Sequence, residues 1–439
     1  MAISPQRRDE LLDALRRGTV PSASLDLLAV GLDGLRPALA AELDSVRGGR
    51  GVLKAVRGEY GSGKTFFARW FQESARRGGF ASSEVQISET ETPLHRLETV
   101  YRRLIENLST TDTRRGALRS IVDGWFYTLE EEVLQRGGSG APDEADLLQR
   151  TNALMEHRLE QVTRQAPAFA ACLRGYRVAL AEGDREVAEG LLAWLSGLPN
   201  VAARIKRKAG IKGDVDHFGA LGFLGGLLTV LRDSGHSGLV LVLDEVETLQ
   251  RVRGDVRDKG LNALRQFMDE VESGRFPGLY LLLTGTPAFF DGPNGVQRLP
   301  PLAQRLHVDF TTDARFDNPR AVQIRLSGFD LEKLEEAGAK VRDIYAARCA
   351  NADRIRKVAD DSYLRDLARA VTGELGGKVG VAPRVFLKKL VADVLDRIDQ
   401  FPDFDPRRHY ALTVSDTELT EVERNARGAS SVDDIELDL

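Results

Sequence analysis

The sequence predicts an α/β fold with a parallel sheet, a large helical insertion and a C-terminal helical lid. Leu239–Leu243 is apolar throughout, and most of Gly278–Pro287 is apolar as well, which is typical of parallel strands buried on both faces. A strand-type run at Gly51–Gly58 leads into a segment with apolar residues at helical spacing. Ser82–Glu89 has the pattern of a second strand. Residues 93–231 are far longer than an ordinary crossover connection and repeat apolar positions at helical spacing, which predicts the insertion.

Composition restricts the class of protein. Among 439 residues, 42% are apolar and 29% are charged, the usual mixture of a soluble globular protein. The net charge of -5 argues against a globally basic nucleic-acid binder. Cys172 and Cys349 are too few for a disulfide framework and form no zinc-type CxxC pair. Because the first residues lack an apolar signal core and the longest apolar stretch is about half a membrane span, we expect a cytoplasmic protein with no membrane partner.

One short stretch carries a phosphate-binding motif. Gly58–Thr65 reads GEYGSGKT, a full match to GxxxxGK[ST], and lies between the first predicted strand and a predicted helix. Glycines let the backbone turn tightly and direct its N–H groups at phosphate oxygens. Lys64 would face the β- and γ-phosphates, and the Thr65 hydroxyl would bind Mg²⁺. The residues predicted to bind the nucleotide here are Gly58, Glu59, Tyr60, Gly61, Ser62, Gly63, Lys64, Thr65 and Phe66.

Acidic and polar residues follow the two buried strands. Asp244 and Glu245 end the first of them, where Asp244 would hold Mg²⁺ and Glu245 would deprotonate the attacking water. Thr284 ends the apolar part of the other, and in a parallel sheet that end faces the ligand. We therefore expect Thr284 to touch the γ-phosphate or the water. A glutamate directly after the aspartate favours hydrolysis over phosphoryl transfer to a small acceptor.

Three arginines are candidates to complete the site. Arg298 and Arg305 precede "LHVDF" (Leu306–Phe310), which has the pattern of another strand, and Arg305 is the first choice for contacting a neighbouring subunit's phosphates. Arg384 stands at the start of the helix predicted over Gly380–Ile398, with Pro383 in its first turn. A lid helix in this place could bring Arg384 onto the γ-phosphate.

In this order the motifs resemble those of an AAA+ ATPase. The resemblance implies a Walker A motif at Gly58–Thr65, Walker B at Asp244–Glu245, sensor 1 at Thr284, an arginine finger at Arg305 or Arg298, and sensor 2 at Arg384.

A narrower resemblance covers most of the chain. It rests on "LRRGTVP", "AVGLDGL", "VRGEYGSGKTFFARWF", "LVLVLDEVETL", "APRVFLKKLVADVLDRID" and "DFDPRRHYALTV". Together these segments are similar to the BrxD family of BREX-system ATP-binding proteins, which belong to bacterial anti-phage defence loci. The resemblance implies an ATPase encoded beside a helicase-like partner, and no reaction beyond nucleotide hydrolysis.

The chain departs from related ATPases at the adenine pocket. Many of them place an arginine after the glycine of an "hhGR" element, whereas here Leu32 follows Gly31. Leu32 can pack on the base but cannot make the polar contact. Thr19, Val20 and Pro21 would complete this wall of the pocket.

The predicted organisation has five parts. They are an N-terminal helical arm with the adenine-pocket segment (1–49), an ATPase core (50–92 and 232–314), the helical insertion (93–231), the helical lid (315–400) and a C-terminal segment with a disordered acidic tail (401–439). The insertion contains the densest basic cluster, which comprises Arg204, Lys206, Arg207, Lys208 and Lys212. This cluster would either contact a DNA backbone or form a solvated loop. It has no interleaved aromatic residues on which bases could stack.

These features favour an oligomeric, Mg²⁺-dependent ATPase that drives a defence complex on DNA. A second hypothesis is a nucleotide-gated switch that recruits partners and hydrolyses ATP slowly. A P-loop kinase is a third class, against which Glu245 and the Arg384 helix both argue.

Overall fold

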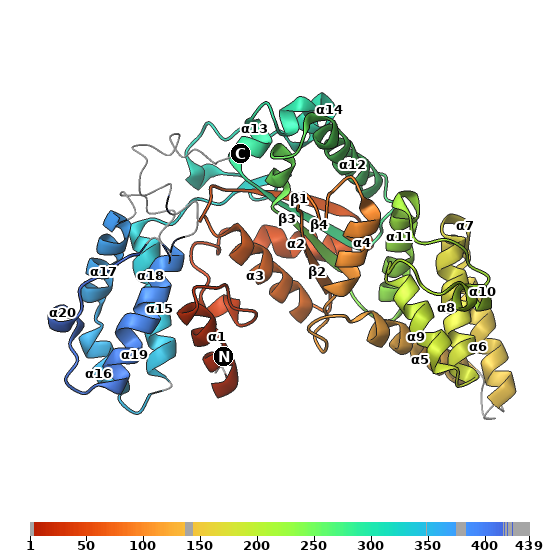
Figure 1. The fold of residues 1–439 in the computed structure, drawn as a ribbon, viewed down its shortest axis with the longest axis horizontal. Coiled ribbons are helices and arrows are strands. Elements are labelled where there is room, and N and C mark those ends of the chain that lie inside the picture. The colour runs from red at the N-terminus through yellow and green to blue at the C-terminus, as the bar shows by residue number, and fades with distance from the viewer. Residues whose placement is uncertain are drawn as a thin grey trace.

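A central sheet lies between two helical lobes in the computed structural model of the chain (Figure 1). The structure describes residues 4–136, 144–347, 349–374 and 383–415, together with residues 417, 419 and 424. The predicted acidic tail (427–439) and residues 380–382 of the predicted lid helix lie outside the described residues. No helix in the described part is long and apolar enough to span a membrane.

The sheet has five strands in the order β2-β3-β4-β1-β5, and every neighbouring pair is parallel. Its strands are β1 (Val52–Arg57), β2 (Ala81–Gln86), β3 (Leu239–Asp244), β4 (Leu279–Gly285) and β5 (Gln323–Arg325). The α/β class and the parallel sheet are confirmed. β3 and β4 are buried along their whole length, as their continuous apolar runs predict. Because all strands run the same way, the segments that follow β1, β3 and β4 meet at one edge.

The fifth strand is not where the sequence placed it. Leu306 ends helix α14 (Pro300–Leu306), and the rest of "LHVDF" has no regular secondary structure. Gln323–Arg325 pairs with β1 instead, within the range predicted as the lid. The reason is burial: His307 and Asp309 are exposed, whereas Gln323 and Ile324 are buried.

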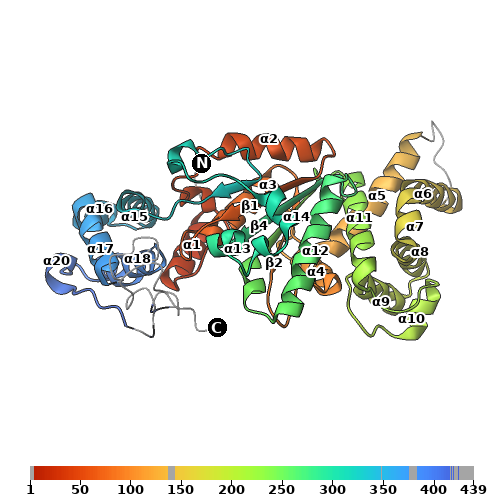
Figure 2. The same cartoon turned by 90° about the horizontal axis from the view of Figure 1, so that it is seen from above.

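Helices cover both faces of the sheet (Figure 2). Alternate residues of the strands face opposite ways, so that Val240 and Val242 share a core with α3, while Leu241 and Leu243 share another with α11 and α12. The helices on the first face are α2 (Arg36–Arg47) and α3 (Lys64–Arg77), and those on the second are α4 (Leu97–Glu106), α11 (His217–Asp233) and α12 (Gly254–Glu272). Shorter helices near the carboxyl edge are α13 (Pro287–Asp291), α14 and the 3-10 turns η2 (Val246–Gln250), η3 (Val296–Arg298) and η4 (Ala314–Phe316).

The regular elements of the range 93–231 are helices. Besides α4 and α11 it contains α5 (Leu118–Arg136), α6 (Glu144–Arg158), α7 (Glu160–Gln165), α8 (Pro167–Ala181), α9 (Arg185–Leu195) and α10 (Ala203–Lys208). Phe223 of α11 packs against α4, α8 and α9, because its ring meets those of Tyr101, Phe169 and Trp194 at centroid distances of 5.8, 5.3 and 5.4 Å.

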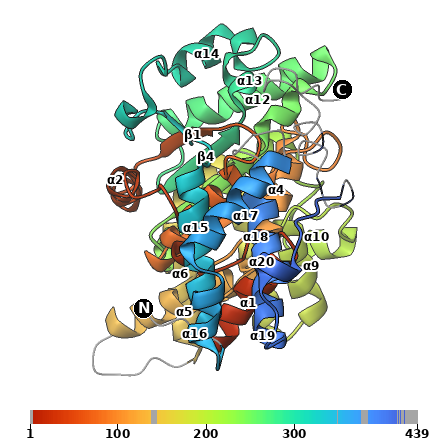
Figure 3. The same cartoon turned by 90° about the vertical axis from the view of Figure 1, so that its left-hand side faces the viewer.

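The C-terminal lobe has its own core, and the N-terminal helix α1 (Pro5–Arg16) packs into it (Figure 3). Its helices are α15 (Leu331–Ala346), α16 (Ala352–Val358), α17 (Asp361–Glu374), α18 (Pro383–Lys389), the π-helical η6 (Leu390–Leu395), α19 (Asp396–Gln400) and α20 (Pro406–His409). Arg16 donates to Asp396 at 2.6 Å, which ties α1 to α19. After η1 (Leu25–Leu27), the chain reaches α2 on the sheet side.

Phe223→Ala should lower the free energy of unfolding by about 3–5 kcal/mol, because it removes a ring on which three helices pack. Urea denaturation of the purified protein measures this loss. Phe218→Ala is the matched control on the same helix, since its ring is 77% exposed and its removal should change stability by about 0.5 kcal/mol or less. Equal losses in the two variants would contradict the assigned core.

Candidate functional site

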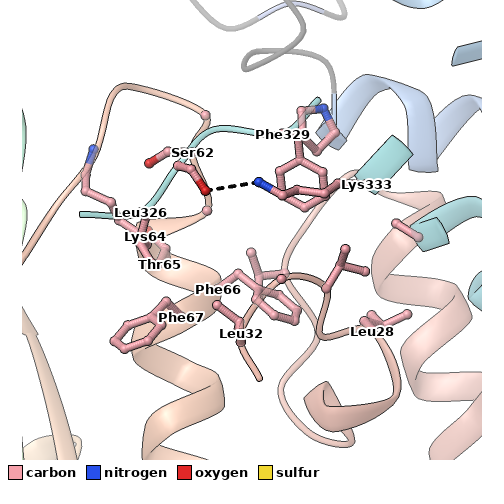
Figure 4. Close-up of a pocket in the computed structure, with 18 of the residues that line it drawn as sticks. Leu28, Leu32, Ser62, Lys64, Thr65, Phe66, Phe67, Leu326, Phe329 and Lys333 are labelled. Atoms are coloured by element: carbon pink, nitrogen blue, oxygen red, sulfur yellow. Dashed lines mark hydrogen bonds between the residues drawn. The ribbon is translucent and has the colours of Figure 1, made fainter. Parts of the chain in front are cut away.

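A cavity of about 790 Å³ lies at the carboxyl edge of the sheet, and several parts of the chain line it (Figure 4). They are the loop after β1 with the start of α3, the segment from the end of α1 to α2, the acids at the end of β3, the residues from η4 to α15, and helices α15 and α18 of the C-terminal lobe. Tyr60, Gly61, Ser62, Gly63, Lys64, Thr65 and Phe66 all line it.

The loop Gly58–Thr65 has the backbone that its glycines allow. Gly61 and Gly63 have φ angles of +80° and +90°, which side chains other than glycine rarely adopt. Gly63 caps the N-terminus of α3, a helix of 14 residues. A Cβ atom on Gly58 would clash with the Ser62 hydroxyl. The loop thus presents backbone N–H groups and the positive end of a helix to the cavity.

Lys64 is buried and turned onto its own loop. Its Nζ donates to the carbonyl oxygens of Gly58 (2.8 Å) and Glu59 (3.3 Å), and it lies 5.1 Å from the centre of the Tyr60 ring. Burial lowers the pKa of Lys64, while the surrounding carboxylates oppose that shift. The ammonium is therefore held by carbonyl oxygens of its own loop.

Asp244 connects the ends of β3 and β4 with the start of α3. The Thr65 hydroxyl donates to one carboxylate oxygen at 3.3 Å, and the Thr284 hydroxyl donates to the other. Thr284 also accepts from the backbone N–H of Glu245 at 3.2 Å. Burial raises the pKa of Asp244, and the Thr284 hydrogen bond counteracts the rise. Thr284 is fully buried beneath Asp244 and does not line the cavity, so its predicted contact with phosphate or water stays a prediction.

Glu245 lines the cavity in an unusual backbone conformation. Its φ angle is +59°, one of three positive values among the described residues other than glycine. Gln86, at the end of β2, donates to its carboxylate at 2.8 Å. The carboxylate of the predicted base is therefore held by a side chain that the sequence analysis did not single out.

Glu247 is a second acid that the sequence analysis missed. It lines the cavity, is 5% exposed, and places one carboxylate oxygen 3.9 Å from Lys64 Nζ. Its other oxygen has no hydrogen-bond partner among the described residues. Burial raises the pKa of Glu247 to about 7. Its place in "DEVE", two residues beyond Glu245, was the available signal.

The far end of the cavity is mainly apolar. Val20, Pro21, Gly31 and Leu32, predicted for the adenine wall, all line it. The sequence analysis did not anticipate their neighbours, which are Leu28, Leu326, Phe329 and Lys333.

The three candidate arginines have different surroundings. Arg384 lines the cavity from α18, and its guanidinium approaches Gly18. Arg305 pairs with Asp269 on α12, and Arg298 pairs with Asp258 on the same helix; neither lines the cavity. Arg305 stands within α14 rather than before a strand.

The residues present fit a magnesium nucleotide better than a metal alone. Thr65 and Asp244 offer a hydroxyl and a carboxylate oxygen, which are ligand types that Mg²⁺ takes together with phosphates and waters. In the described part of the chain, no group of three or more His, Cys, Asp or Glu side chains is placed to hold a metal ion. Among the residues that the structure describes, the buried Ser62 hydroxyl and one Glu247 oxygen have no hydrogen-bond partner, so polar groups of the cavity are left for a ligand to satisfy.

Comparison with known families identifies the chain. The family model described as "BREX system ATP-binding protein BrxC/D" matches residues 3–414. The chain belongs to this family. A search of curated proteins finds no match. Membership confirms the resemblance drawn from the motifs and makes ATP the ligand that this family of BREX defence proteins binds.

In this BrxC/D family member, the pKa of Glu247 predicts a pH dependence of stability without nucleotide. Its folded pKa of about 7 exceeds the ordinary value of 4.5, so the folded state keeps a proton that the unfolded state releases. The contribution to stability is present below pH 4.5 and is lost as pH rises through 7, by up to roughly 3 kcal/mol. Urea unfolding of wild type and Glu247→Gln at several pH values measures it. Wild type should lose stability relative to Glu247→Gln as pH rises, because the amide does not titrate, and parallel curves would contradict the burial of this acid.

Proposed function

We propose that the chain is an AAA+-like P-loop ATPase that hydrolyses ATP to ADP and phosphate within the BREX defence system. The observation that carries the proposal is the meeting of Lys64, Thr65, Asp244 and Glu245 at one edge of the sheet, in one cavity. A phosphate-binding loop, a magnesium-side acid and a candidate base are the parts that such hydrolysis needs.

Each side chain has a role that follows from its place. The loop N–H groups and Lys64 would bind the β- and γ-phosphates, with Lys64 exchanging the carbonyls of Gly58 and Glu59 for phosphate oxygens. Thr65 and Asp244 would hold Mg²⁺, which when bound neutralises phosphate charge. Since Asp244 already accepts from Thr284, its orientation is set before the nucleotide arrives.

Glu245 would take the proton from the attacking water. Its backbone N–H is fixed by Thr284 and its carboxylate by Gln86, so the position of the base depends on the ends of β4 and β2. Glu247, beside Lys64, is the alternative acid if Glu245 is not the base.

The proposal includes a homo-oligomer in which Arg305 acts on the nucleotide of a second copy. Arg305 and Arg298 lie on α14 and η3 against α12, outside the cavity of their own chain. Arg384 would act within the chain, because it lines the cavity from α18.

DNA and a helicase-like partner enter the proposal as what ATP hydrolysis would act on. The candidate DNA surface is the basic cluster on and after α10. Arg204 pairs there with Glu186, and Lys206 with Asp214 at 3.1 Å, so a DNA backbone would have to displace two carboxylates. The switch hypothesis predicts slow ATP turnover that DNA does not change. It also predicts that partner binding depends on the nucleotide.

Glu245→Gln should keep ATP affinity and lower turnover on the order of a hundredfold or more, because an amide cannot accept the water's proton.

Lys64→Ala should lose tight ATP binding, since it removes the charge facing the phosphates. Calorimetric binding and steady-state phosphate release measure the two effects. Wild-type turnover in Glu245→Gln would move the role of base to Glu247, and unchanged ATP affinity in a folded Lys64→Ala variant would refute the loop assignment.

Arg305→Ala should bind ATP normally and hydrolyse it poorly, by roughly 10³-fold where such a finger acts. Mixing it with Lys64→Ala should restore activity, because an intact loop from one chain can meet an intact arginine from the other. Arg298→Ala is the matched variant on the same face. If mixing restores nothing and activity per subunit does not depend on protein concentration, Arg305 is not the finger.

A further inference from the structure

We propose that Lys333, at the start of α15 in the C-terminal lobe, binds the nucleoside half of the nucleotide. The inference rests on the proposed function, since it assumes that the phosphates occupy the loop at Gly58–Thr65.

Lys333 is fixed at the cavity by its own helix start. Asp330 caps α15 by accepting from the backbone N–H of Lys333 at 2.8 Å. The side chain then runs into the cavity wall, where its Nζ donates to Ser327 Oγ at 3.0 Å and to the Gly328 carbonyl at 3.1 Å. Figure 4 draws Lys333 beside Phe329, with Ser62, Lys64 and Thr65 on the loop side of the cavity.

The N-terminal segment leaves room for this lysine. Gly31 has a φ angle of +71°, and a Cβ atom there would lie 3.3 Å from Lys333 Cε. A side chain at position 31 would therefore press on the lysine stem as well as strain the backbone. Lys333 thus spans the gap between the adenine-wall segment and the lid.

The surroundings of Lys333 suit a nucleoside. The nearby lining residues Leu28, Leu32, Leu326 and Phe329 are apolar. The Phe329 ring also lies near the phosphate loop, since a Cβ atom placed on Gly63 would be 3.8 Å from it. A flat base can pack against such walls, but they offer it no hydrogen-bond partner. In an apolar pocket a few polar groups fix the orientation of the ligand.

Lys333 has donor capacity for that contact. An ammonium carries three donors, and Ser327 and Gly328 accept two of them. A carboxylate oxygen of Asp330 lies 3.6 Å from the same Nζ, and this carboxylate is largely exposed. The third donor would turn from Asp330 to a ring nitrogen of the base or a ribose oxygen, while both hydrogen bonds are kept. Arg325, another cation of the lining, is already held by Asp317 at 2.8 Å and by the Phe310 carbonyl at 3.2 Å.

The test compares ATP with inorganic tripolyphosphate, which has the phosphates but no nucleoside. Lys333→Met keeps most of the apolar stem and removes the donors. It should weaken ATP binding about tenfold, as expected for a lost hydrogen bond from a charged group, and leave tripolyphosphate binding within about twofold of wild type. Lys333→Arg should recover part of the ATP affinity.

Lys357→Met is the control in the same lobe. Lys357 is exposed on α16 and does not line the cavity, so its removal should leave both affinities unchanged. If Lys333→Met lowers the affinity for ATP and for tripolyphosphate equally, Lys333 contacts the phosphates. If it lowers neither affinity, Lys333 has only a structural role. Both outcomes overturn the proposal. Lys64→Ala separates the two hypotheses, because undiminished binding of both ligands in that variant would refute the loop assignment, whatever Lys333 does.

Discussion

The site depends on one buried carboxylate. Asp244 is 4% exposed and accepts from Thr65 on α3 and from Thr284 on β4, so three elements far apart in the sequence meet at its two oxygens. Burying a carboxylate is costly unless hydrogen bonds or a cation compensate for the lost water. Two hydroxyl donors compensate in part. Asp244, Glu245 and Glu247 all act on the ammonium of Lys64. In the proposed function, a divalent cation that arrives with the nucleotide would compensate for these carboxylates.

The second constraint is the position of the cavity between two hydrophobic cores. Leu11, Leu12 and Leu15 of the N-terminal arm belong to the core of the C-terminal lobe, whereas Leu25 and Leu32 belong to the core on the α3 face of the sheet. The chain therefore crosses from one core to the other beside the cavity, and it crosses back near Leu326–Phe329. Residues of both crossings line the cavity, so a ligand that fills it would contact both.

The sequence predicted what local chemistry determines. The phosphate loop and Asp244–Glu245 were found because glycines, lysine and acids at strand ends have a fixed meaning in a parallel sheet. The strand at "LHVDF" was wrong because alternation does not reveal burial, and β5 formed at a three-residue segment with a weaker pattern. The positions of Lys333 and Phe329 in the cavity could not be predicted, since their nearness to the loop depends on how the C-terminal lobe packs. Gln86 lies at the end of a predicted strand, yet its pairing with Glu245 requires the strand order.

The ion pairs on the surface do not exclude the proposed contacts in trans. Arg305 is held by Asp269 and Glu272, and Arg298 by Asp258, all on α12. These side chains are partly exposed, and exposed ion pairs contribute little to stability because water screens them. A phosphate oxygen of a neighbouring chain, in a site from which water is excluded, attracts a guanidinium more strongly than a solvated carboxylate does. The acids on α12 would then hold the arginine in place until a second copy packs against this face, and the same helix would present its carboxylates to the interface once the arginine has moved.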